Sequence, residues 1–261
     1  MRRLSNQRSI SPFDDASNRL FGAMLSGGGQ LSDSRRKIID LTIRRLKDRG
    51  IWDLIDILYV FAALDSVCAL LNWKNPGTFT ATLTNAPSFA ADRGYTGNDT
   101  SALINSNYNP ATNAISYALN SASVFGWNRT ASPSGSSGLV GQIASFNTAL
   151  ILAFPTGTEV RVQINQAAGG NVDATPAAMD QLFSGNWDGT NGIIYRNGVQ
   201  IGNLPRTSDT VASSNICFLT TSSLFGNEEI AAGGVGGSLT AGQHLELYGA
   251  LLPYMQAVGA A

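Results

Sequence analysis

The sequence has little of the chemistry from which most catalytic and metal sites are built. Its 261 residues include one histidine, His244, and two cysteines, Cys68 and Cys217. Cysteines so far apart offer neither a disulfide framework nor zinc-ligand spacing, so we expect two buried thiols. A Ser-His-Asp or Cys-His site would have to use His244, and no G-x-S-x-G turn accompanies it. We therefore expect His244 to be structural and the protein not to be an enzyme.

Acidic residues are also missing from the arrangements that cleave glycosidic bonds or hold metal ions. A retaining glycosidase needs two carboxyl groups about 5–5.5 Å apart, which on one strand face means i, i+2 spacing. None of the four glutamates has such a partner, and adjacent Glu228 and Glu229 would point to opposite faces of a strand. Asp173, Asp188 and Asp209 are candidate calcium ligands without the spacing of a recognisable calcium loop. The sequence predicts no cofactor, with calcium as the open alternative.

Charge is scarce and unevenly distributed along the chain. Charged residues make up 13% of the sequence, against about a quarter in typical domains. With 43% apolar residues and 28 glycines, the composition excludes a disordered chain and favours an all-β domain with many turns. Residues 1–50 hold 11 of the 17 lysines and arginines. This basic segment suits nucleic acid, an acidic protein surface or a solvated helix face, and the low charge elsewhere makes nucleic acid an unlikely partner.

The longest apolar run is GIWDLIDILYVFAALDSVCALLNW, residues 50–73. It is long enough to cross a bilayer, but Asp53, Asp56 and Asp65 would each cost roughly 2.5–3.5 kcal/mol at the centre. We therefore predict no membrane span and interpret the run as the second helix of a hairpin, buried on all sides. Its middle is expected to be buried at Leu58, Phe61 and Leu64.

The sequence before this run is basic and helical. We expect residues 1–31 to form an extended basic arm, with a short helix at 15–25, and residues 32–72 to form the helical hairpin. Ser32 or Asp33 can cap the first helix of that hairpin. Gly50 fits the position just beyond its end, with Ile51 packing back on Leu46 as in a Schellman motif.

After residue 73 the pattern changes to short alternating runs separated by turns, which indicates a β-sandwich over residues 73–261. Asn197-Gly198, inside IIYRNGVQI, is the preferred pair of a two-residue hairpin turn. The glycine-rich stretch at 233–237 lacks the G-K-[ST] of a phosphate-binding loop and fits turn or bulge geometry better.

The chain is expected to close with a helix at residues 240–258. Thr240 and Gln243 have the spacing of a capping box at its start. Pro253 is expected to kink or end it, because proline cannot donate the helical hydrogen bond. The predicted fold is therefore mainly β: a sandwich preceded by an arm and a helical hairpin, and closed by a C-terminal helix.

Three stretches, in this order, resemble a known group of proteins. They are residues 50–73, the segment ADRGYTGND with the Asn109-Pro110 turn, and the hairpin IIYRNGVQIG followed by GGVGGSLTAGQHLELYGALLPYM. Together they are similar to structural proteins of tailed phages and prophages that end in a concanavalin A-like (LamG-like) jelly-roll domain. The resemblance covers residues 32–261.

This resemblance implies a structural component of a bacteriophage virion, such as a head decoration, a spike or a tail fibre. The protein would be made in the host cytoplasm, and its N-terminus, MRRLSNQRSISPFDD, has no apolar signal segment. Its partners would be other virion proteins of the capsid or tail and further copies of itself in a homo-oligomer. Attachment to the particle would use the N-terminal segment, with candidate contacts Arg2, Arg3, Arg8, Phe13, Leu20 and Phe21.

The alternative is a lectin module that binds a host-surface polysaccharide. Aromatic side chains at a sandwich rim stack on sugar rings, and Asn or Asp side chains bond the hydroxyls. The segment SGNWDGTNG offers Trp187, Asp188 and Asn191, with Tyr195 beside the hairpin turn. Trp127 is a second candidate. For each aromatic residue, packing in the core is the competing interpretation.

Overall fold

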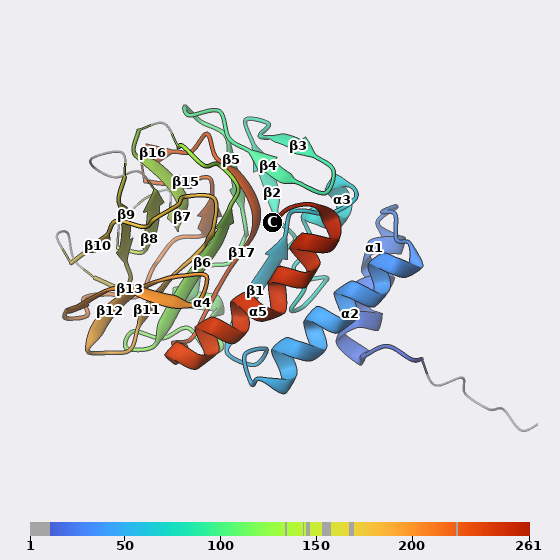
Figure 1. Cartoon of the computed structure of the whole chain (residues 1–261), viewed down its shortest axis with the longest axis horizontal. Helices are drawn as coiled ribbons and strands as arrows, with labels where there is room; N and C mark the ends of the chain where they lie inside the picture. The colour runs from blue at the N-terminus through green and yellow to red at the C-terminus, as the bar shows by residue number, and fades with distance from the viewer. Residues whose placement is uncertain are drawn as a thin grey trace, which may run out of the picture.

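Two antiparallel sheets, stacked face to face, form the body of the protein (Figure 1). The computed structural model describes residues 11–133, 135–142, 144, 147–152, 158–166, 170–222 and 224–261. The larger sheet runs in the order β13 (Val199–Pro205), β12 (Asn191–Arg196), β11 (Leu182–Trp187), β6 (Ala122–Asn128), β17 (Glu229–Gly236), β4 (Gly94–Thr96) and β3 (Ser88–Ala90), with β1 (Ile55–Val60) also paired to β17.

The smaller sheet covers the inner face of the larger one. Its order is β10 (Val172–Ala174), β9 (Val160–Gln163), β8 (Ala149–Leu152), β7 (Ser137–Gln142), β14 (Ile216–Phe218), β5 (Leu103–Asn105) and β2 (Thr82–Thr84). Strands β15 (Thr220–Thr221) and β16 (Leu224–Phe225) form a separate two-stranded ribbon. This arrangement confirms the predicted mainly β, jelly-roll-like sandwich.

Aromatic side chains fill the space between the two sheets. Phe218 of the smaller sheet meets Tyr59 and Phe61 edge to face, with ring centroids 5.5 Å and 5.1 Å apart. Phe61 also packs edge to face on Tyr95. Such pairs contribute roughly 0.5–1.5 kcal/mol each beyond the area they bury. Phe61 is fully buried, as predicted from the sequence, and so is Leu58, whereas Leu64 is only half-buried.

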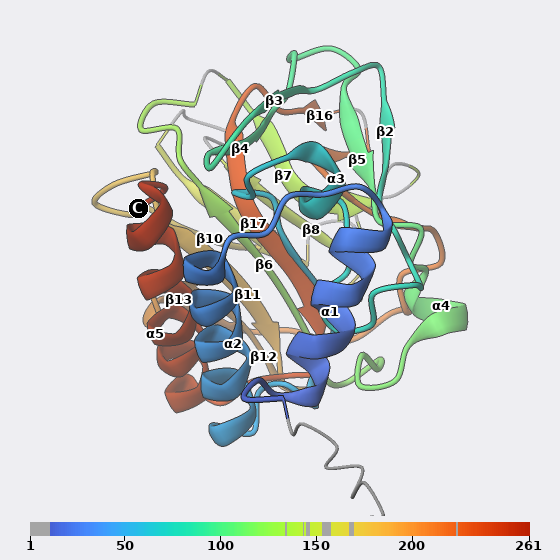
Figure 2. The ribbon, with the colours of Figure 1, turned by 90° about the vertical axis from the view of Figure 1, so that its right-hand side faces the viewer.

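Three helices cover the outer face of the larger sheet. Figure 2 shows α1 (Asp15–Ser26), α2 (Asp33–Asp48) and α5 (Ala241–Val258) lying in a row across it. The short helices α3 (Ser66–Ala69) and α4 (Pro110–Asn113) lie in connecting segments. The larger sheet is therefore covered on both faces, which explains why strands β1, β6, β11 and β17 are buried at every position instead of alternating with exposed residues.

The predicted ends of helix α2 are confirmed. The Ser32 side chain accepts from the Arg35 N–H at the start of the helix. At the other end, Gly50 adopts φ +65°, and the backbone N–H groups of Gly50 and Ile51 bond the carbonyls of Lys47 and Leu46. This is the Schellman arrangement expected from the sequence, and Ile51 is fully buried.

Helix α5 begins as predicted, at the Thr240–Gln243 capping box, but Pro253 does not end it. The helix continues to Val258 and closes at Gly259, which adopts φ +73°. Proline removes the hydrogen bond to the carbonyl four residues earlier and crowds it. That carbonyl belongs to Gly249, an exposed position with no side chain, and the Arg45 guanidinium approaches it at 3.5 Å. These two features explain how the helix accommodates the proline.

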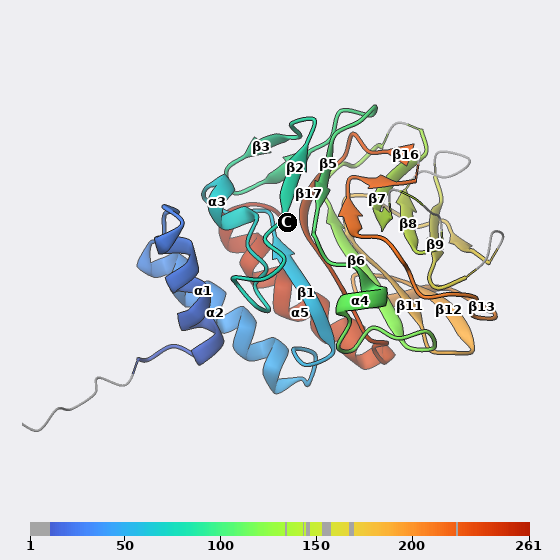
Figure 3. The same cartoon turned by 180° about the vertical axis from the view of Figure 1, so that it is seen from behind.

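The expected second helix of the hairpin is wrong. Within the run at 50–73, Ile55–Val60 is strand β1, antiparallel to β17, with Leu58 opposite Gly234 (Figure 3). Its outer edge is bonded too, because the Leu58 N–H donates to the Asn72 side chain and the Leu58 carbonyl accepts from the Trp73 N–H. A short apolar run buried on both faces has no period that separates helix from strand.

Glycines in β17 make room for this strand, so the turn interpretation of residues 233–237 is also wrong. A side chain at Gly234 would place Cβ 2.4 Å from the Ile57 carbonyl oxygen, and one at Gly236 would place it 2.1 Å from that of Leu54. Neither fits without backbone movement. The sandwich therefore starts at Ile55, not at residue 73, and the segment at 32–72 contains helix α2 and the short helix α3 but no helical hairpin.

The N-terminal helices belong to the same packed body as the sandwich. Residues 1–31 are not an extended arm throughout, because the short helix expected at 15–25 forms as α1. Arg35 of α2 donates to Asp92 at 2.6 Å and to the Tyr254 hydroxyl at 3.1 Å, and that hydroxyl donates to the Ala62 carbonyl. Lys47 pairs with Asp14. The basic residues thus fasten α1 and α2 to the rest of the chain.

Two of the predicted particle-attachment residues are used inside the protein instead. Leu20 is fully buried and Phe21 nearly so, and both belong to the single hydrophobic core. Phe13 is partly buried and packs edge to face on Phe21 at 5.3 Å. Buried side chains are not available to another protein, so the expectation is wrong for Leu20 and Phe21. Arg2, Arg3 and Arg8 lie outside the described residues.

The structure bears on two further predictions, that of no membrane span and that of two buried thiols. No helix in the described part of the chain is both long and apolar enough to cross a membrane. Cys68 and Cys217 are free and buried, as predicted, and burial raises the pKa of each thiol to about 12. A thiol with so high a pKa is largely unreactive at neutral pH.

Candidate functional site

The sequence-predicted site around Trp187 does not form a binding surface. Trp187 is the last residue of β11 and is fully buried, and its indole N–H donates to the Leu119 carbonyl at 2.9 Å. The Asp188 carboxylate accepts the backbone N–H groups of Thr190 and Asn191, closing a turn. Trp187 is therefore a core residue, while Asp188 is exposed and Asn191 half-buried beside it.

Tyr195 also belongs to the core. Only 2% of its surface is exposed, and its ring stacks on the His244 imidazole with centroids 3.9 Å apart. His244 is fully buried as well, and its Nδ1 shares a 2.9 Å hydrogen bond with the Ser184 hydroxyl. Burial lowers the pKa of His244 to about 3, so the ring is neutral at pH 7. The expectation of a sugar contact at Tyr195 is wrong, and His244 occupies a structural position, as predicted.

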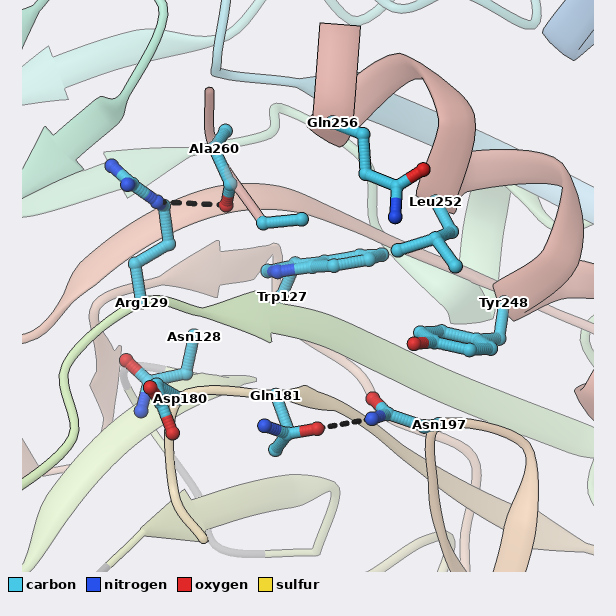
Figure 4. A pocket seen from close by; sticks show the side chains of 11 residues that line it. Trp127, Asn128, Arg129, Asp180, Gln181, Asn197, Tyr248, Leu252, Gln256 and Ala260 are labelled. Atoms are coloured by element: carbon cyan, nitrogen blue, oxygen red, sulfur yellow. Dashed lines mark hydrogen bonds between the residues drawn. The ribbon is translucent and has the colours of Figure 1, made fainter. Parts of the chain in front are cut away.

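Trp127 lies at the opposite end of the sheet, and it alone of the predicted aromatic residues lines an open cavity. The cavity has a volume of about 380 Å³, within the usual range of small-molecule sites. Figure 4 shows the Trp127 indole at its centre, with Gln181 and Asn197 on one side and Leu252, Gln256 and Ala260 on the other. The complete lining is Trp127, Asn128, Arg129, Asp180, Gln181, Asn197, Tyr248, Leu252, Gln256, Ala260 and Ala261.

Four separate segments of the chain bring these residues together. The end of β6 supplies Trp127, and Asn197 comes from the β12–β13 turn. The segment before β11 contributes Asp180 and Gln181. Helix α5 contributes Tyr248, Leu252 and Gln256, which stand four residues apart and so share one helix face. That spacing was the one signal in the sequence that could have indicated the helical wall of the cavity.

The aromatic part of the cavity is a stacked pair. The rings of Trp127 and Tyr248 lie 5.7 Å apart with an interplanar angle of 22°. Trp127 lies in strand β6 and is only 4% exposed, whereas Tyr248 of helix α5 is half-exposed. The Trp127 indole N–H has no acceptor among the described residues and is not sealed from solvent. The pair therefore presents an apolar surface together with an available hydrogen-bond donor.

Several polar groups of the lining are already bonded within the protein. Asn128 is buried and donates to the carbonyls of Thr130 and Met179. The Asn197 amide donates to the Gln181 side-chain oxygen and accepts from the Leu182 N–H. These bonds fix the orientation of the two amides that form one wall. They leave the Gln181 amide nitrogen as a free donor within the described structure.

Arg129 is the one cationic side chain in the lining, and each of its three guanidinium nitrogens already makes a bond within the protein. One guanidinium nitrogen pairs with Glu229 at 2.9 Å, while the other two donate to the carbonyls of Ala260, at 2.8 Å, and Gly259, at 3.3 Å. Burial lowers the pKa of Arg129, partly offset by the Glu229 charge. By contrast, Asp180 and Gln256 are exposed, and neither side chain has a hydrogen bond within the described part of the chain.

The buried glutamates Glu228 and Glu229 are engaged by other side chains within the protein. Glu228 is buried against Ser137, and Glu229 pairs with Arg93 and Arg129. Among the described residues, no group of three or more His, Cys, Asp or Glu side chains could hold a metal ion. Of the calcium candidates, Asp173 accepts two hydrogen bonds from the Arg161 guanidinium, one on each carboxylate oxygen.

Comparison with known proteins places the fold. No protein-family model and no curated protein matches the sequence. Among solved structures, domain 4 of AbnA, an extracellular GH43 arabinanase from Geobacillus stearothermophilus in complex with arabinotriose, superposes with a TM-score of 0.55 at 15% identity. The match covers 74% of this chain and 98% of that domain.

Two larger proteins contain a similar domain. A Trypanosoma rangeli sialidase matches with a TM-score of 0.53 at 10% identity over 85% of this chain, which spans 40% of the sialidase. The binding domain of botulinum neurotoxin DC in complex with SialylT matches with a TM-score of 0.51 at 14% identity, over 77% of this chain and 52% of that one. At these identities the likeness establishes the fold alone: the chain is a jelly-roll-like β-sandwich.

Proposed function

We propose that the protein binds carbohydrate in the cavity between the end of β6 and helix α5. The observation that carries the proposal is the pairing of a stacked Trp127–Tyr248 platform with polar groups that have no partner among the described residues. The fold shared with a domain in complex with arabinotriose supports it.

Each part of the lining has a role in this proposal. The apolar face of a sugar ring packs on the exposed part of Tyr248, with the Trp127 indole N–H donating to a ring or hydroxyl oxygen. Sugar hydroxyls both donate and accept, and Gln181 and Gln256 provide amide groups that do the same. Because Gln181 is already held by Asn197, its amide is oriented before the ligand arrives, which limits the entropy lost on binding.

The proposal predicts that binding depends on the helical wall of the cavity. Screening the protein on a glycan array and titrating the best ligand should give a defined affinity. Tyr248→Ala is expected to weaken that affinity at least tenfold, and Gln256→Ala about threefold to tenfold, in line with about 1.4 kcal/mol per factor of ten. Both side chains are partly or fully exposed, so the fold should survive, as circular dichroism would verify.

A matched control separates this cavity from the site suggested by the sequence. Asp188→Asn keeps the oxygen that accepts from Thr190 and Asn191 and lies at the other end of β11. It should bind the ligand as tightly as the wild type. Loss of binding in Asp188→Asn with retention in Tyr248→Ala would refute the cavity as the binding site. An array without any ligand would refute carbohydrate binding altogether.

We further propose that the module binds glycans without cleaving them. Glu228 and Glu229 are each engaged by other side chains, and the His244 imidazole is buried away from the cavity lining. A bound oligosaccharide incubated with the protein should remain intact by mass spectrometry. Release of shorter sugars at a rate that Asp180→Asn abolishes would contradict this part of the proposal.

For the setting in which the module acts, we propose a phage virion, where it would serve as a head decoration, spike or tail fibre and assemble as a homo-oligomer. The support is the sequence resemblance over residues 32–261 and the basic N-terminal segment. Since Leu20 and Phe21 pack inside the protein, attachment falls to residues 1–10, which include Arg2, Arg3 and Arg8. A chain lacking residues 2–10 should fold and bind glycan but fail to co-purify with capsid or tail protein; normal co-purification would contradict this route of attachment.

A further inference from the structure

We infer that the cavity selects uncharged sugars and discriminates against acidic ones such as sialic and uronic acids. This inference rests on the proposed carbohydrate binding and adds the class of ligand. It follows from how charge is arranged around the Trp127–Tyr248 platform: among the described residues, the side chains of the lining offer one free carboxylate, that of Asp180, and no free cation.

Arg129 is the lining residue whose charge suits an acidic sugar, but its guanidinium is already bonded within the protein. All three of its guanidinium nitrogens have partners: Glu229 and the carbonyls of Gly259 and Ala260. Its side chain is only 12% exposed, and it pairs with the Glu229 carboxylate at 2.9 Å. A sugar carboxylate would have to displace Glu229, which is itself held by the second arginine, Arg93, through two bonds. Recognition of an anion at Arg129 would therefore break an existing ion-pair network.

Asp180 contributes the opposite property. Its carboxylate is exposed at the cavity wall, and no protein donor bonds it in the described structure. An ionised carboxylate only accepts hydrogen bonds, so it fits two adjacent hydroxyls that donate to it, and it repels a second carboxylate. The remaining free groups, on Gln181 and Gln256, are uncharged amides. A neutral, hydroxyl-rich sugar satisfies all of these groups, whereas a sialic or uronic acid leaves its charge without a partner.

This selectivity is independent of the ligands of similar folds. The sialidase and the toxin binding domain that share the fold are described with sialic acid derivatives or SialylT, and the arabinanase domain with arabinotriose. The fold alone therefore does not determine the charge of the ligand. The residues lining this cavity do, and they favour the neutral class.

The test compares neutral sugars with related sugars that carry a carboxylate. The full-length protein would be titrated with lactose and 3′-sialyllactose, and with methyl glucoside and methyl glucuronide, alongside an array of further neutral and acidic pairs. We expect the neutral member of each binding pair to bind at least tenfold more tightly at low ionic strength. Raising the salt concentration should narrow that ratio, because screening weakens the repulsion from Asp180.

Substitution of the carboxylate makes the test specific. Asp180→Asn keeps the shape and one acceptor oxygen, and it should reduce the neutral-to-acidic ratio at least threefold. Asp188→Asn removes the same charge at the other end of the sheet and should leave the ratio unchanged, so it controls for net charge. Tighter binding of the acidic members would overturn the inference while leaving carbohydrate binding intact. Absence of binding to every neutral and acidic probe would overturn both.

Discussion

Replacing Leu58 with aspartate is expected to unfold the whole protein, not merely to release its N-terminal helices. Leu58 is fully buried in β1, next to Gly234 of β17, and both its backbone groups are hydrogen-bonded to the segment at Asn72 and Trp73. An aspartate there would place an unpaired charge in the middle of the packed structure. The expected cost exceeds about 4 kcal/mol, a large part of the stability of most domains.

Urea denaturation and near-ultraviolet circular dichroism measure this effect. Leu58→Asp should give little soluble protein, or protein without a cooperative transition. Leu41→Asp is the matched control, because Leu41 lies on α2 with 41% of its surface exposed, and its stability should change by less than about 1 kcal/mol. If Leu58→Asp kept the aromatic signal of the sandwich and lost only helix, residues 50–73 would form the second helix of a hairpin after all, and the assignment of β1 to the sheet would be wrong.

The second large effect is expected on acidification, through His244. Its pKa is lowered to about 3 by burial, while an unfolded histidine titrates near 6.5. Between these values the unfolded chain binds a proton that the folded chain does not, so stability is complete above pH 6.5 and falls as the pH drops towards 3. Each pKa unit corresponds to about 1.4 kcal/mol, which gives a total loss of roughly 4–5 kcal/mol.

The environment of the ring explains why protonation is so unfavourable. The imidazole stacks on Tyr195, shares its Nδ1 with Ser184, and has a buried Nε2 without a partner in the described structure. Comparing wild type with His244→Gln at pH 6.5 and pH 4.5 isolates the effect from that of the carboxylates. The wild type should lose about 2–3 kcal/mol more than the variant over this interval. Equal losses would show that the ring accepts a proton in the folded state.

Much of the fold could be predicted from local sequence signals. The caps of α2 and α5 and the Asn197-Gly198 turn depend on a few neighbouring residues, and all three form as expected. Asn197 and Gly198 adopt φ +50° and +78°, the left-handed values that the turn requires. Strand β1 was missed because its conformation depends on β17, nearly 180 residues later, whose glycines leave space for it.

The candidate site was harder to predict for the same reason. Trp187 sits between polar turn residues and looks like a rim residue, but alternation along β11 directs its ring into the core. Trp127, in a strand whose residues are all buried, looked more like a core residue, yet it forms the floor of the cavity. The walls come from the turn at Asn197 and from α5, and only the four-residue spacing of Tyr248, Leu252 and Gln256 was visible locally.

The basic character of the N-terminal segment also has a different meaning in the folded protein. Arg35 pairs with Asp92, Lys47 with Asp14, and Arg49 with Glu246. These basic residues, which the sequence offered as contacts for a partner, therefore largely pair with acidic residues of the protein itself. The proposed attachment to virion proteins would therefore use residues outside this network.

The location of the binding site is tested most directly by the indole N–H signals in a nuclear magnetic resonance titration with the best neutral glycan. The protein has four tryptophans, and Trp127→Phe and Trp187→Phe assign the two signals that matter. The Trp127 signal should shift and saturate with the glycan, because its indole N–H faces the cavity. The Trp187 signal should stay in place, since its N–H is bonded to the Leu119 carbonyl. Saturable movement of the Trp187 signal with a stationary Trp127 signal would contradict the site proposed here.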